Sequence, residues 1–274
     1  PKIKKLYDSN QNLRKVKNIN AYLLDGTNLI IQSRTSPICN VPEARTGSKA
    51  IDDGNFFMNE SERDEYLRSE PSGKKYIKRI VGNTEFVKDI KRYCFWIKAT
   101  DVINSNLPIL KRKIQNIKIF RSKSSRKETR IKANSPTLFA ERKQPSSDYI
   151  IIPELSSRKY TPIGFVSKDI IASNLVKIIP ESDLYHFGIL SSIMHMAWLN
   201  YIGGKFGSGT RYSVNIVYNN FPWPREVSKK NKEAVKKKSQ EIIDMRAITG
   251  RTLKSLYGSS MPNKLENAHQ ELDK

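Results

Sequence analysis

The sequence has little cysteine, few acidic residues and no long apolar run. Its two cysteines, Cys39 and Cys94, stand far apart in 274 residues and form no disulfide framework, so we expect reduced thiols in a cytoplasmic protein. The longest apolar segment, 187–202, is interrupted by His195 and Asn200 and is too short to span a bilayer. These features argue against a secreted disulfide-bonded domain and against a membrane protein.

Motifs for catalysis are also missing. The sequence has no glycine-rich turn for a methyl donor, and no two prolines are adjacent, so an Asp or Asn before Pro-Pro-aromatic, the methyltransferase motif that holds a flipped base, is excluded. A metal-dependent nuclease site would have only Glu141 and Lys143, because no Asp lies between Asp101 and Asp148 to complete it. We therefore expect no catalytic residue in this chain and a binding function.

The acidic and histidine residues do not indicate a metal site. Asp52 and Asp53 precede Gly54, a pattern that is typical of a turn far more often than of a cation site. His186 and His195 lie on one predicted helix with no acidic or cysteine partner in reach along it. We interpret both histidines as core or interface residues.

Positive charge is what the chain has in excess. Lys and Arg number 49 against 27 Asp and Glu, a net charge of +22. Residues 111–143 alone hold twelve Lys or Arg against Glu128 and Glu141, a net +10, interleaved with Ile and Phe at spacings that can bury a face. A folded surface with so much positive charge repels itself unless a polyanion neutralises it, and DNA or RNA is the commonest such partner.

Three groups of residues are candidate nucleic-acid contacts. The basic stretch would bind phosphates, and segment 156–160 offers hydroxyls and cations to phosphates or to a guanine edge. Within this segment, we expect Arg158 and Lys159 to reach bases. Segment 205–211 could form a nest of amides for a phosphate, although a hairpin turn is the simpler interpretation. The candidates are Lys111, Arg112, Lys113, Arg121, Lys123, Arg126, Lys127, Arg130, Arg142, Lys143, Ser156, Ser157, Arg158, Lys159, Tyr160, Lys205 and Arg211.

Hydrophobic periodicity and turn signals predict an α+β fold. We expect a mixed or antiparallel sheet domain over 48–180 and a mainly helical segment over 181–274. Residues 1–47 read as the end of a preceding domain with a linker, and Pro1 in place of an initiator Met fits a fragment of a longer chain. The expected elements are a turn at 8–10, a strand at 28–33, a helix capped by Asn59 and Glu62, antiparallel strands over 76–99, a helix from Asp101 that Pro108 interrupts, a strand at 148–153, a strand pair over 170–179, one helix from Asp183 to Gly203, a hairpin over 205–224 and an amphipathic helix after Glu226.

Several segments spread over nearly the whole chain carry a family resemblance. They are KNINAYLLDG (17–26), IDDGNFFMNESERDEYL (51–67), RIVGNTEF (79–86), RYCFWI (92–97), SSRKYTPIGF (156–165), HMAWLNYIGGKFGSGTRYSVNIVYNNFPWP (195–224) and SLYGSSMPNKLENAHQELD (255–273). In this order they resemble the large single-chain restriction-modification enzymes of the MmeI type and their methyltransferase relatives. The block 195–224 is the most specific of them.

The resemblance implies a function for the chain. In that family a nuclease and an adenine methyltransferase domain come first, so this chain would be the end of the methyltransferase domain, the target recognition domain and a C-terminal helical segment. The implied partners are duplex DNA and the methyltransferase domain of the same full-length chain. The parent would use S-adenosylmethionine to methylate adenine N6 within a short asymmetric site, with Mg²⁺ if a nuclease domain is present, and this chain would bind no cofactor. The Ser-Ser-x-x-Tyr match at 156–160 implies base-reading side chains nearby.

Two alternatives stay open at this point. A net charge of +22 also permits an RNA-binding or ribosome-associated module. A metal-dependent nuclease that uses Glu141 and Lys143 is the enzyme alternative.

Overall fold

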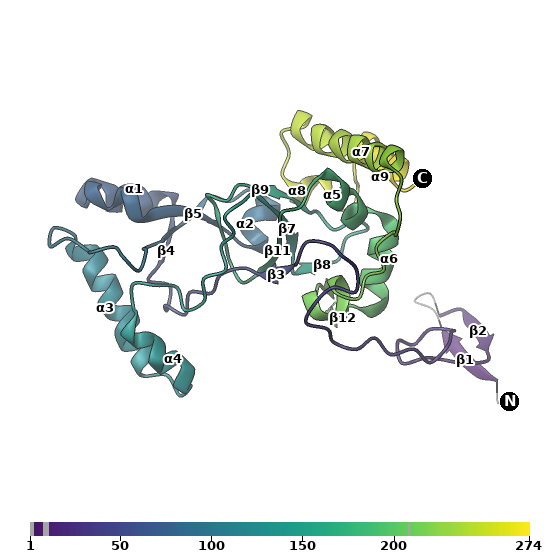
Figure 1. Cartoon of the computed structure of the whole chain (residues 1–274), viewed down its shortest axis with the longest axis horizontal. Coiled ribbons are helices and arrows are strands. Elements are labelled where there is room, and N and C mark those ends of the chain that lie inside the picture. The colour runs from purple at the N-terminus through teal and green to yellow at the C-terminus, as the bar shows by residue number, and fades with distance from the viewer. Residues whose placement is uncertain (1–2, 8–10, 208) are drawn as a thin grey trace.

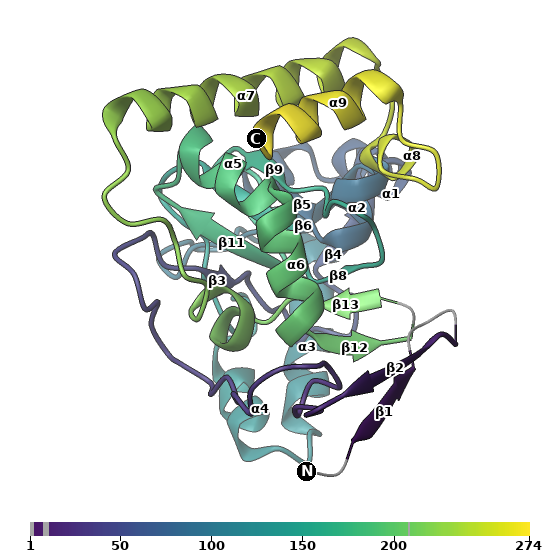
Figure 2. The ribbon, with the colours of Figure 1, turned by 90° about the vertical axis from the view of Figure 1, so that its right-hand side faces the viewer.

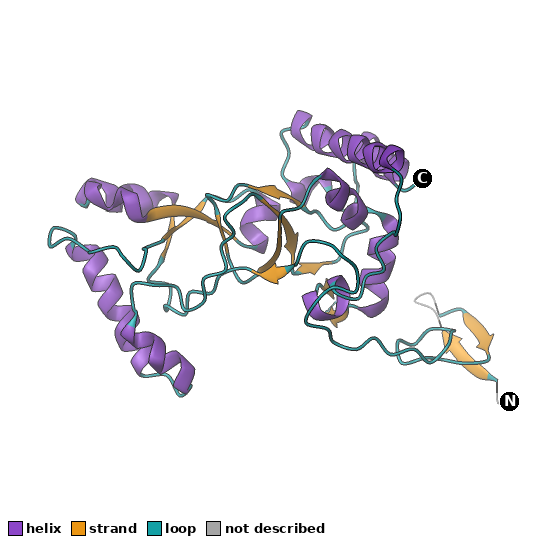
Figure 3. Ribbon diagram, in the orientation of Figure 1, coloured by secondary structure: helices purple, strands orange, loops and turns teal. Residues whose placement is uncertain are grey.

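Two four-stranded sheets form the centre of the computed structural model, which describes residues 3–7, 11–207 and 209–274 (Figures 1 and 3). The first sheet has the strand order β10-β5-β6-β4 and the second the order β3-β11-β7-β9. Every pairing in them is antiparallel except that of β10 with β5. Their strands are β3 (Arg45–Thr46), β4 (Phe57–Asn59), β5 (Ile77–Val81), β6 (Arg92–Phe95), β7 (Tyr149–Pro153), β9 (Gly164–Val166), β10 (Ile171–Ala172) and β11 (Val176–Pro180). Together with the helices, they confirm the predicted α+β class.

Helices and two smaller sheets surround this centre (Figure 3). The helices are α1 (Glu60–Ser69), α2 (Asn83–Lys88), α3 (Pro108–Ser122), α4 (Lys127–Ile131), α5 (Leu184–Ser191), α6 (Ile193–Ile202), α7 (Lys229–Ile248), α8 (Leu253–Leu256) and α9 (Asn263–Leu272), with shorter turns at Pro71–Tyr76, Lys132–Asn134 and Val214–Tyr218. The smaller sheets are the hairpin β1 (Lys4–Tyr7) with β2 (Leu13–Val16) and the sheet of β12 (Gly204–Phe206), β13 (Gly209–Arg211) and β8 (Leu155–Ser156). None of the described helices is both long and apolar enough to cross a bilayer.

Strand β7 is buried on both faces, which explains why its sequence is apolar throughout. Successive side chains of a strand point to opposite faces, so a strand that is covered on both sides needs apolar residues at every position. Ile150 and Ile152 pack in a core with α5, α6 and the C-terminal helices, whereas Ile151 packs in a second core with residues of β10 and β11. The predicted strand at 148–153 is thus confirmed, at the junction of two cores.

Local signals placed several element ends correctly. The Asn59 side chain accepts from the Glu62 N–H at 2.9 Å and the Glu62 carboxylate accepts from the Asn59 N–H at 2.8 Å, the expected capping box of α1. The hairpin expected over 205–224 forms only in its first part, as β12 and β13, because Val214–Tyr218 is a helical turn. Residue 208 of its loop and the turn predicted at 8–10 lie outside the described residues.

Around the first sheet, one prediction was confirmed and one was wrong. The antiparallel strands expected over 76–99 form as β5 and β6, and the chain between them forms helix α2, where the Glu85 carboxylate accepts from the Gly82 N–H at 2.9 Å. Pro108 begins α3 instead of interrupting a helix from Asp101, since proline has no N–H and its fixed φ suits the first helical position. The Asp101 carboxylate accepts from the Lys98 N–H at 2.7 Å in the preceding turn.

Three other predicted elements differ in the structure. Residues 28–33 form no strand, and the Ile31 N–H donates to the Tyr22 hydroxyl at 2.7 Å. The single helix expected from Asp183 is two helices, because Ser192 has an extended backbone and caps α6 through the His195 N–H. The strands over 170–179 do not pair with each other, since β10 joins the first sheet and β11 the second.

Two parts of the chain project from the body of the molecule. Helices α3 and α4 extend from one end of the long axis, and the β1–β2 hairpin extends from the other end toward the same side (Figures 1 and 2). Helices α7 and α9 lie side by side and cover α5 on the opposite side of the molecule (Figure 2).

Candidate nucleic-acid interface

Helices α3 and α4 form a basic arm (residues 108–134) whose start is anchored in the core. The buried carboxylate of Glu70 accepts the N–H groups of Ile109 and Leu110, and a negative charge is favourable at a helix N-terminus. Leu110, Ile117 and Arg121 bury one face of α3, and the other cations of this helix lie on its remaining faces. Of the apolar residues that interleave with the charges, Ile117 is buried and docks the arm. Ile119, Phe120 and Ile131 are exposed, so the predicted buried face forms only in part.

Most of the predicted phosphate contacts in the arm are exposed. These exposed residues are Lys111, Arg112, Lys123, Arg126, Lys127 and Arg130, together with Lys118 and Lys132, which were not singled out from the sequence. Lys113 is half-buried. Arg130 also donates to the carbonyls of Ser124 and Ser125 at 2.8 Å each, which fixes the turn between the two helices. Glu128 is the one acid in residues 108–134, so little opposes the positive field of the arm.

Arg121 is an exception, and the structure corrects its assignment as a DNA contact. Its side chain is fully buried, and burial lowers the pKa of its guanidinium while Asp52 opposes that shift. Its five N–H groups donate at 2.7 to 3.1 Å to the carbonyls of Ala50, Ile51, Lys132, Ser135 and Leu138. Arg121 therefore ties segment 50–51 to segment 132–138 at the base of the arm, and it has no donor left for a phosphate.

Arg142 and Lys143 are exposed but partly engaged by the protein. The Arg142 guanidinium lies 3.8 Å from the centroid of the Trp96 ring and donates to the Ile97 carbonyl at 2.7 Å. Burial lowers the pKa of Arg142. Lys143 pairs with Glu141 at 3.0 Å, which has the geometry of a surface ion pair. Within the described residues, no group of three His, Cys, Asp or Glu side chains could hold a metal ion.

The segment after β8 packs against the C-terminal helices. Tyr160 is buried, its hydroxyl donates to the Asp273 carboxylate at 2.7 Å, and its ring stacks on His269 at 4.2 Å between centroids. Burial of the Tyr160 hydroxyl and its contact with Asp273 raise its pKa. Tyr160 is thus a docking residue, which corrects its assignment as a DNA contact. Lys159 is exposed but pairs with Glu266 at 2.6 Å.

A buried polar chain in the C-terminal helices holds this docking site. Arg246 donates to the Tyr257 hydroxyl and, at 2.6 Å, to the Ile163 carbonyl. Burial lowers the pKa of His269 to about 3, so its ring is neutral and accepts the Tyr257 O–H at Nε2 over 2.8 Å. Arg158 in turn donates to the Tyr257 carbonyl. No local pattern indicated this cluster, because Arg158 and Ile163 lie 99 and 83 residues before the residues that they contact.

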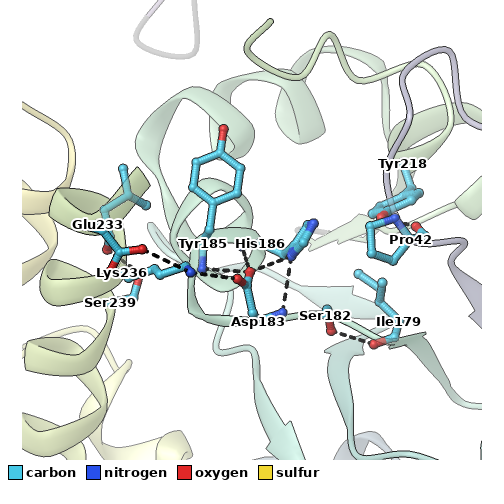
Figure 4. Close-up of polar contacts among 11 residues, drawn as sticks. Pro42, Ile179, Ser182, Asp183, Tyr185, His186, Tyr218, Glu233, Lys236 and Ser239 are labelled. Atoms are coloured by element: carbon cyan, nitrogen blue, oxygen red, sulfur yellow. Dashed lines mark hydrogen bonds and ion pairs between the residues drawn. The ribbon is translucent and has the colours of Figure 1, made fainter. Parts of the chain in front are cut away.

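Asp183 connects α5 to α7 and gives His186 an acidic partner, which was not expected from the sequence (Figure 4). Its Oδ1 accepts the N–H groups of Tyr185 and His186 and lies 2.7 Å from His186 Nδ1, while Lys236 contacts Oδ2 at 3.3 Å. The helix cap itself is thus the acidic partner that was not expected for His186. Burial raises the pKa of Asp183, but the contacts with His186 and Lys236 lower it overall.

His195 is a core residue, as predicted. It is fully buried, its Nε2 lies 3.0 Å from the Tyr212 hydroxyl, and its ring packs edge-on against Phe221. Burial lowers the pKa of His195 to about 3. The imidazole is therefore neutral at physiological pH.

Lys205 and Arg211 lie on the β12–β13 hairpin and contact the protein rather than each other. Lys205 donates to Thr210 and to the Asn200 carbonyl at 3.1 Å. Arg211 is exposed and pairs with Glu154 at 2.6 Å, and the buried Lys177 pairs with the same carboxylate at 3.0 Å. Burial raises the pKa of Glu154, but these two cations lower it overall.

The predicted site residues do not gather at one place. The basic arm lies at one end of the molecule, whereas β8 and the β12–β13 hairpin lie toward the other (Figure 1). Strand β8 pairs with β13, so Ser156 and Ser157 are brought close to the hairpin. Ser157 is exposed and Ser156 is half-buried. An α+β body that carries a fixed arm of exposed cations has the charge distribution of a nucleic-acid recognition module.

Comparisons with known families identify this module. The model of the MmeI target recognition domain matches residues 25–225, and that of the MmeI C-terminal domain matches residues 227–274. The chain therefore belongs to the MmeI family and consists mainly of its target recognition and C-terminal domains.

Two longer relatives match almost all of this chain. DNA methyltransferase A of Bacillus subtilis (strain 168) is 35% identical over 277 residues, which are 99% of this chain and 31% of that protein. The solved structure of the Type IIL restriction-modification enzyme MmeI in complex with DNA is 39% identical, with a TM-score of 0.93 over 99% of this chain and 37% of that one. The chain thus spans about a third of the length of the relatives that it matches.

Proposed function

We propose that this chain recognises a specific sequence in double-stranded DNA on behalf of a DNA methyltransferase of which it is a part. One observation carries the proposal: the fold superposes over nearly its full length on a relative that was solved in complex with DNA. The exposed cations of the basic arm support it, because phosphate contacts supply most of the affinity of such proteins.

The parent would supply the chemistry. In this proposal, the residues that bind S-adenosylmethionine and the flipped adenine, whose N6 is methylated, belong to a preceding domain, since this sequence has neither of their motifs. Leu23, Leu29 and Ile30 support such a neighbour, because these apolar residues are 62 to 74% exposed in the segment that leads into the recognition domain. A methyltransferase domain of the same chain would cover them.

Selection from a random duplex library tests the proposal. The full-length parent is incubated with random duplexes and competing structured RNA at fixed salt, and the bound fraction is sequenced. Sequence-specific recognition predicts one enriched asymmetric motif and resistance to RNA competition. Enrichment of no motif, or displacement of duplex by equimolar RNA, would contradict it.

A further inference from the structure

A small pocket lies between the recognition domain and the C-terminal domain, and residues of α2, β8 and α8 line it. Its volume is about 220 Å³, which is below the roughly 300 to 1,000 Å³ of pockets that hold drug-sized ligands. Lys88, Arg158 and Lys254 line it, together with the hydroxyls of Ser156 and Ser157. No Asp or Glu is among its described lining residues.

The three cations come from separate parts of the chain. Lys88 ends α2, Arg158 follows β8, and Lys254 lies in α8 of the C-terminal domain. Three positive charges that share one small cavity repel one another, and the fold supplies no carboxylate there to offset them. An anion would offset this repulsion.

The contacts around the pocket leave its donors available. In the described structure no hydrogen bond or ion pair engages the side chains of Lys88 and Lys254, both of which are exposed. Arg158 donates one Nη1 bond to the Tyr257 carbonyl, which fixes its guanidinium at the pocket and leaves other N–H groups free. Glu85, on the same helix as Lys88, is held by Arg92 at 3.2 Å and does not line the pocket.

We propose that this pocket binds one phosphate group of the DNA backbone, with Lys88, Arg158 and Lys254 as its ligands. The inference rests on the proposed function and gives the C-terminal domain a direct part in DNA binding through Lys254. It also assigns Arg158 to the backbone, whereas we expected from the sequence that Arg158 would reach a base. A backbone contact positions the duplex but carries no base information.

Salt dependence of binding tests the pocket in the full-length parent. The double variant Lys88→Gln, Lys254→Gln should lose one phosphate contact on preferred and scrambled duplexes alike, which lowers the slope of log K against log salt by about 0.9. When salt is raised from 50 to 200 mM, the affinity of the double variant should therefore fall by a factor about 3.5-fold smaller than the factor for the wild type. The matched control is Lys229→Gln, Lys237→Gln, which removes two exposed lysines of α7 and should leave the slope unchanged.

Neutral backbone analogues identify the source of the phosphate. Duplexes with a single methylphosphonate at successive positions should reveal one position that weakens the wild type and leaves the double variant unaffected. An unchanged salt slope in the double variant, or a loss confined to the preferred sequence, would overturn the pocket assignment. The thermal unfolding of the variant controls for folding, and failure of the wild type to bind any duplex would refute the proposed function instead.

Discussion

Replacement of Arg121 by methionine should release the basic arm from the body of the protein. The substitution keeps an unbranched side chain but leaves five backbone carbonyls without their donor. A hydrogen bond from a charged group contributes roughly 1.5 to 3 kcal/mol, but the five losses do not add, because water reaches the carbonyls once the arm frays. Removal of one partner from a buried charged network costs about 3 to 5 kcal/mol, and we expect a loss of that size here.

Hydrogen exchange and urea unfolding measure this effect. The amides of α3 and α4 should exchange much faster in Arg121→Met, whereas those of β7 and β11 should change little, because the second sheet keeps its own cores. The control is Arg126→Met, which removes the same charge from an exposed site of the arm and should change stability by less than about 0.5 kcal/mol. If Arg121→Met were within 1 kcal/mol of the wild type with unchanged exchange in the arm, the anchoring role would be refuted.

Three further outcomes follow from the same contacts. Arg126→Ala should lower the salt slope of duplex binding by about 0.9 on every sequence, and an effect confined to one sequence in anisotropy titrations would contradict a phosphate contact. Asp183→Ala should cost about 1 kcal/mol at pH 5 to 7 in urea unfolding, because it removes a helix cap. Since the pKa of Asp183 is lowered in the fold, that difference should shrink as pH falls below the 3.8 of an unperturbed Asp, and a difference that persisted at pH 2 would argue against an ionised cap. The pKa values of His195 and His269 are lowered to about 3, whereas unfolded histidine titrates near 6.5. The contribution of the two neutral rings to the free energy of unfolding is therefore full above about pH 6.5 and declines below it, because the unfolded state then binds protons that the folded state does not. Unfolding at pH 5.5 should therefore take up about two protons in calorimetry with buffers of different ionisation enthalpy, and no uptake would contradict the neutral buried rings.

Local patterns predicted the features that depend on near neighbours in the chain. The capping box at Asn59 and Glu62 formed as expected, because a cap involves residues within one turn. The all-apolar strand at 149–153 was equally predictable, since burial on both faces requires it. Where two local signals competed, the prediction was wrong: Pro108 reads both as a breaker and as a first helical residue, and only the Glu70 carboxylate at that helix start decides between them.

The amino-acid sequence alone determined the fold class and the cationic character of residues 111–143, because periodicity and composition are properties of the chain itself, and the resemblance of its motifs indicated the family. Tertiary structure decided which cations are available to a ligand. Arg121 and Arg126 are alike in sequence, yet one is fully buried among backbone carbonyls and the other is exposed. Burial and hydrogen-bond partners come from segments tens of residues away, so the role of an individual charge is set by contacts that no local pattern records.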